Sequence, residues 1–73
     1  MLYARKEAVI ERLQAVSIHG LPFYDVYFRY TDKPDLPTRF ARVQGEMMPP
    51  GIQVGDRVLV ESIENTVMRI DKL

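Results

Sequence analysis

The chain has 73 residues and no cysteine, and its ten basic residues balance its ten acidic ones. This length fits one domain spanning residues 1–73, and the lack of cysteine excludes disulfide bonds and cysteine-based metal sites. The single histidine, His19, is too few for the usual structural zinc sites. A net charge of zero argues against a protein held to nucleic acid mainly by phosphate charge.

The sequence also predicts that no segment spans a membrane. No apolar run approaches the ~18 residues that such a helix needs. No charged and then apolar leader opens the chain, so we expect no signal peptide and a cytoplasmic location.

Residues 4–16, ARKEAVIERLQAV, fit two descriptions. Their composition is helix-forming, and some of their apolar residues follow helical spacing. However, the segment continues into further apolar residues without a glycine cap, which favours a long strand. We predict the strand, with helix as the alternative. The step from Ile10 to Leu13 breaks the two-residue period, so we place a β-bulge near Glu11-Arg12.

Residues 23–30, FYDVYFRY, indicate a strand most clearly because aromatic and β-branched residues dominate them. Alternation divides these residues into two faces, Tyr24, Val26, Phe28 and Tyr30 against Phe23, Asp25, Tyr27 and Arg29. The charges on the second face make the first one the core face. A proline-containing loop over 31–38 and a third short strand over 39–44 follow.

The C-terminal third predicts a hairpin. Gly51 and Gly55 are suited to turns, and a strand over 57–63 follows them. A polar break at 64–66 separates it from a returning strand over 67–71. Val58 and Val60 share the face expected to be buried.

Five or six short strands with frequent turns predict an all-β fold, a small five- or six-stranded antiparallel barrel. Closing a barrel would remove exposed strand edges. The residues expected in its core are Ile10, Val26, Phe28, Val58 and Val60.

The pattern AVIERLQAVSIHGLPFYDVYFRY, then RFARV, PPGIQVGDRVLV and VMRID, resembles small bacterial β-barrel domains of unknown function. The resemblance implies an OB-like or SH3-like topology and no catalytic residues. The tail VGDRVLVESIENTVMRID is also similar to the end of small hydrogenase-maturation chaperones of OB-like fold. Those chaperones need a cysteine directly after the initiator methionine. Here that position is Leu2, so the metal-handing chemistry does not carry over.

No catalytic, metal or cofactor site emerges from the sequence. His19 lies beside a turn glycine, without a partner acid that would make it a general base. Asp56 at a strand start is expected to bond nearby backbone amides. As a metal ligand it would need converging carboxylates, for which Glu46 and Glu61 are the candidates. We therefore predict a protein that is not an enzyme and holds no cofactor.

The candidate binding surface comprises Tyr27, Arg29, Arg42, Met47 and Met48. Tyr27 beside two arginines is typical of nucleic-acid binders of OB type. The alternative is cross-strand pairing, with Arg29 stacked on Tyr27 and paired to Asp25 or Glu61.

The methionines Met47 and Met48 in the Met-Pro loop suit an adaptable protein contact, or else plug one end of the barrel. The sequence thus predicts a non-catalytic interaction module that binds protein, through this loop or an exposed edge. The alternative function is weak single-stranded nucleic-acid binding through the outer face of the aromatic strand.

Overall fold

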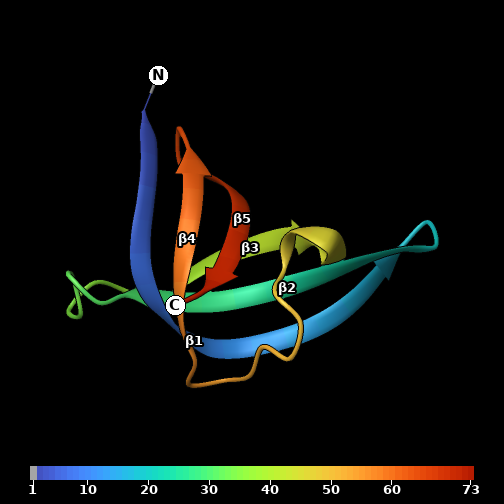
Figure 1. Cartoon of the computed structure of the whole chain (residues 1–73), viewed down its shortest axis with the longest axis horizontal. Coiled ribbons are helices and arrows are strands. Elements are labelled where there is room, and N and C mark those ends of the chain that lie inside the picture. The colour runs from blue at the N-terminus through green and yellow to red at the C-terminus, as the bar shows by residue number, and fades with distance from the viewer. Residues whose placement is uncertain (1) are drawn as a thin grey trace.

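The computed structural model describes residues 2–73, which form one antiparallel sheet and a short 3-10 helix (Figure 1). The elements in chain order are β1 (Tyr3–Ile18), β2 (Leu21–Tyr30), β3 (Arg39–Gln44), η1 (Gly45–Met47), β4 (Arg57–Ile63) and β5 (Thr66–Lys72). The predicted all-β antiparallel fold is confirmed. Residues 4–16 lie within β1 and are strand, as predicted, not helix.

The long strand β1 belongs to both halves of the sheet. Its first part pairs with β4 and the rest pairs with β2, giving the strand order β3-β2-β1-β4-β5. Three consecutive strands followed by a fourth that returns beside the first make a Greek key. The register with β2 shifts between Ile10 and Arg12, which confirms the predicted bulge. A bulge bends its strand, and β1 curves strongly in Figure 1.

Two tight turns join the hairpins. His19 and Gly20 connect β1 to β2 with φ values of 53° and 77°. Glu64 and Asn65 connect β4 to β5 with φ values of 51° and 69°. Positive φ at both central residues of a two-residue loop is the type I′ geometry, whose twist matches that of the flanking strands. Both turns therefore support the twist that curls the sheet.

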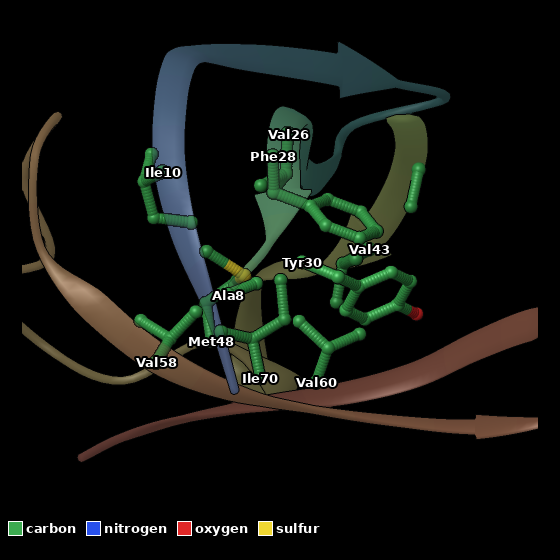
Figure 2. Packing of buried hydrophobic residues seen from close by; sticks show 11 residues of the cluster. Ala8, Ile10, Val26, Phe28, Tyr30, Val43, Met48, Val58, Val60 and Ile70 are labelled. Atoms are coloured by element: carbon green, nitrogen blue, oxygen red, sulfur yellow. The ribbon is translucent and has the colours of Figure 1, made fainter. Parts of the chain in front are cut away.

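The core lies inside the curl of the sheet, where side chains from all five strands meet (Figure 2). All five residues predicted to be buried are at most 1% exposed. They are Ile10, Val26, Phe28, Val58 and Val60. The same cluster also contains Ala8, Tyr30, Ala41, Val43, Met48 and Ile70, each at most 9% exposed.

The sheet curls without closing. The two end strands, β3 and β5, are not hydrogen-bonded neighbours, so the hydrogen-bonded ring of a complete barrel is interrupted there. A groove of about 460 Å³ lies at this junction, lined by residues of both strands and by Phe23 of β2.

No helix within residues 2–73 is long and apolar enough to cross a membrane.

Truncating the core aromatic tests this packing. Phe28 is 1% exposed and its ring lies edge-on to Tyr30, with centroids 5.3 Å apart. Phe28→Ala should lower the free energy of unfolding by about 3–5 kcal/mol in a urea titration, because it leaves a cavity. Phe40, at 52% exposed, is the matched control, and Phe40→Ala should cost less than about 1 kcal/mol. A similar small loss for Phe28→Ala would show that the faces are wrongly assigned.

Candidate functional site: the outer aromatic row

Three side chains form a row across the outer face of β1, β2 and β3. Arg12 lies opposite Tyr27, and Tyr27 lies opposite Phe40. The rings of Tyr27 and Phe40 are tilted at 52° with centroids 5.1 Å apart. The Arg12 guanidinium carbon is 5.3 Å from the centroid of the Tyr27 ring. We call these three residues the aromatic row.

Both ends of the row, Arg12 and Phe40, are exposed. Phe40 is 52% exposed and Tyr27 is half-buried between its two neighbours. A cation above a ring face is attracted by the ring quadrupole, so Arg12 is held in place without a carboxylate partner. Among residues 2–73 no carboxylate lies within ion-pair distance of Arg12.

Arg29, one of the predicted site residues, holds the proline loop. Its Nε donates to Glu11 Oε2 at 3.0 Å and its Nη1 donates to the Pro34 carbonyl at 3.1 Å. Nη1 also donates to the Leu36 carbonyl, and Nη2 donates to Thr38 Oγ1 at 3.0 Å. The planar fork of Arg can bind several acceptors at fixed angles, and here it gathers the loop onto β2. Arg29 thus has a structural role in this conformation.

Arg42, the second predicted arginine, forms a two-pronged pair with Asp25. Its Nε and Nη2 donate to Asp25 Oδ1 and Oδ2 at 2.7 Å and 3.0 Å. Hydrogen bonding to Arg42 lowers the pKa of Asp25 and raises the pKa of Arg42. Cross-strand pairing therefore occurs, but the partners expected for Arg29 are wrong. Arg29 pairs with Glu11 and not with Asp25 or Glu61, and it is Arg12 that lies over Tyr27.

The Glu11 carboxylate links the bulge of β1 to the loop. It accepts hydrogen bonds from the Thr38 hydroxyl and from Arg29. These two bonds, the one from Thr38 first, lower the pKa of Glu11. The row is thereby flanked on both sides by neutralised pairs, Arg29 with Glu11 and Arg42 with Asp25.

The rest of the outer face is also charge-paired. Arg57 bonds Glu7, and the Tyr3 hydroxyl donates to Glu61 Oε2 at 2.6 Å. Both Arg5 and Arg69 contact Asp71, at 3.5 Å and 2.9 Å. The outer face formed by β4, β5 and the first part of β1 therefore carries a network of paired charges, and the aromatic row is distinct from it.

The two methionines of the predicted surface face inward. Met48 is 8% exposed within the core, and Met47 is half-buried against it. This matches the alternative expectation, in which the methionines fill one end of the sheet. We therefore leave Met48 out of the candidate surface.

The other residues considered in the sequence have local roles. His19 is exposed in the β1–β2 turn. Asp56 Oδ2 accepts a hydrogen bond from the Gln53 amide at 2.9 Å, as expected of a residue that bonds nearby backbone. Within residues 2–73 no group of three or more His, Cys, Asp or Glu residues is placed to hold a metal ion.

Sequence reasoning missed two members of the aromatic row. Phe40 shares a face with Arg42 by simple alternation, so the signal was present in the third strand. Arg12 reaches the row only because the bulge moves it opposite Tyr27, and this register depends on pairing.

No protein-family model, curated protein or solved structure matched this chain.

Removing the Arg29 side chain should release the proline loop. We expect Arg29→Ala to lower backbone NMR order parameters over residues 32–38 from about 0.85 to below about 0.6, because three acceptors in that loop lose their donor. Arg42→Ala, which removes an arginine that bonds Asp25, should leave the loop unchanged. Unchanged order parameters in Arg29→Ala would refute the clamp.

The pairs of Glu11 and Asp25 also predict a pH dependence. Their pKa values are lowered in the folded state, so their stabilisation is present above the unfolded values of about 4.3 and 3.9. It is lost as pH falls through the folded pKa values. A variant with Glu11→Gln and Asp25→Asn should therefore lose less stability than wild type between about pH 5 and pH 2. Urea titrations at several pH values in this range measure the free energy of unfolding. An equal dependence of this free energy on pH in the variant and the wild type would contradict the assignment.

Proposed function

We propose that this chain is a non-catalytic protein-binding module whose contact surface is centred on Phe40 and Tyr27. The observation that carries the proposal is the exposed Phe40 ring, packed on Tyr27 and Arg12 and flanked by neutralised ion pairs. Aromatic residues and arginine supply most interface hot spots, usually with a surround that contributes little energy. The aromatic row has this composition.

The preference for protein over nucleic acid follows from the state of the arginines. A strand-borne nucleic-acid site needs cations free to meet phosphates as well as rings for stacking. Arg29 and Arg42 are already bound to carboxylates. Within residues 2–73 Arg12 and Arg39 have no carboxylate partner, but Arg39 lies over the Tyr30 ring, so Arg12 is the cation next to Tyr27. Weak single-stranded nucleic-acid binding through Arg12 and Tyr27 is the second candidate. With a single phosphate contact its salt slope would be about −0.7.

We also propose that the chain belongs with small bacterial β-barrel domains of OB-like type. The Greek-key strand order and the gap between β3 and β5 support the OB-like alternative, because OB folds are partly open five-stranded Greek-key barrels. The proposed compartment is the cytoplasm.

A peptide selection tests the proposed surface. A displayed peptide library would be selected on the wild-type protein and counter-selected on Phe40→Ala. Peptides that bind should shift the amide NMR signals of the aromatic row, and Phe40→Ala should weaken their binding at least about 30-fold. Met68→Ala is the matched control, because Met68 is a similarly exposed apolar residue, at 47%, on β5.

Two outcomes would contradict this proposal. The first is that the peptides shift amide NMR signals only on other strands, and that Phe40→Ala and Met68→Ala weaken peptide binding equally. The binding surface would then lie outside the aromatic row. Micromolar binding of fluorescent single-stranded DNA or RNA at 150 mM salt, abolished by Tyr27→Ala, would favour nucleic acid instead.

A further inference from the structure

The β1–β2 hairpin extends past β4 as an arm, residues 13–24 (Figure 1). Its β2 strand pairs with β3 as far as Phe23, so only the tip, residues 17–22, is two-stranded. β4 leaves β1 at Ile10, where the Ile10 amide bonds the Asp56 carbonyl at 3.0 Å and its carbonyl accepts from Gly55 at 2.8 Å. Beyond this point the described backbone bonds of β1 go to β2 alone. The other edge of residues 13–18 therefore has unpaired backbone groups, on alternate residues.

This edge lacks the protective features of the others. Proteins protect free strand edges with charges, proline or bulges. The β3 edge carries Arg39 and Arg42, and the β5 edge carries Arg69, Asp71 and Lys72. Where β2 extends past β3 it carries Pro22. The β1 edge reads LQAVSI, with neither charge nor proline, and its Ala15 and Ser17 are exposed.

The outer face of the arm adds an apolar patch next to this edge. Val16 lies opposite Phe23, and Ile18 lies opposite Leu21, which is 60% exposed. No third strand or loop of the described chain pairs with the edge beside this patch. The arm therefore offers backbone donors and acceptors together with apolar side chains along one uncharged margin.

We propose that this edge pairs antiparallel with the same edge of a second copy of the chain. A twofold axis beside Val16 would place Val16 of one copy opposite Val16 of the other. It would likewise place Ala15 opposite Ser17 and Gln14 opposite Ile18. No like charges meet, and the two Val16–Phe23 patches become continuous. Opposed β-branched residues stabilise antiparallel pairs. The net charge of zero leaves no overall repulsion between copies.

Self-association measured by sedimentation velocity, from about 10 μM to 1 mM, tests the proposal. Wild type should show a concentration-dependent dimer, and Val16→Lys should raise its dissociation constant at least about tenfold by opposing two like charges. Met68→Lys, which adds the same charge to an exposed position on β5, should leave the dimer unchanged. Circular dichroism would check that each variant keeps its strand content.

A charge swap removes the ambiguity of a poorly folded variant. Val16→Lys and Val16→Glu should each be monomeric alone, and an equimolar mixture should form a heterodimer, because opposite charges then face each other across the axis. Phe40→Ala should dimerise like wild type, which separates this inference from the proposed binding surface. A wild-type protein that stays monomeric up to 1 mM, or a dimer unaffected by Val16→Lys, would overturn the proposed pairing of the two β1 edges.

Discussion

The structure depends on a single inserted residue in β1. At Glu11 the strand gains one residue relative to β2, and this allows β1 to bend from one half-sheet into the other. Before the bulge Ala8 and Ile10 face the core, and after it Leu13 does. A one-residue shift exchanges the two faces of a strand, so the bulge also decides that Arg12 lies outside, over Tyr27.

The inserted residue also joins the strand bend to the loop. The Glu11 carboxylate bonds Arg29 and Thr38, and Arg29 in turn bonds the carbonyls of Pro34 and Leu36. Exposed ion pairs usually contribute little stability when isolated, but a network that shares one arginine orders several groups at once. The geometry of the bend and the position of the loop beside Phe40 are therefore linked.

Charge pairing determines what the outer face offers to a partner. A protein with ten cations and ten anions can still carry a basic patch if the signs separate. Here they do not separate around Tyr27, because Glu11 and Asp25 pair with the neighbouring arginines Arg29 and Arg42. The remaining exposed feature is an aromatic one. The open sheet adds a second kind of surface, the uncharged edge of the arm, whose backbone groups are not used within the monomer.

The sequence by itself determined the strands, the bulge and the central core, because alternation of apolar and polar residues is a local signal. Alternation in residues 23–30 and 57–63 identified which face of each strand is buried. The break in the two-residue period after Ile10 located the bulge. Only the tertiary structure decided the ion-pair partners, the inward position of Met48, the composition of the aromatic row and the open junction between β3 and β5. These depend on which strands become neighbours and in what register. That choice is made by packing between segments far apart in the chain, where the sequence pattern carries no pairing information.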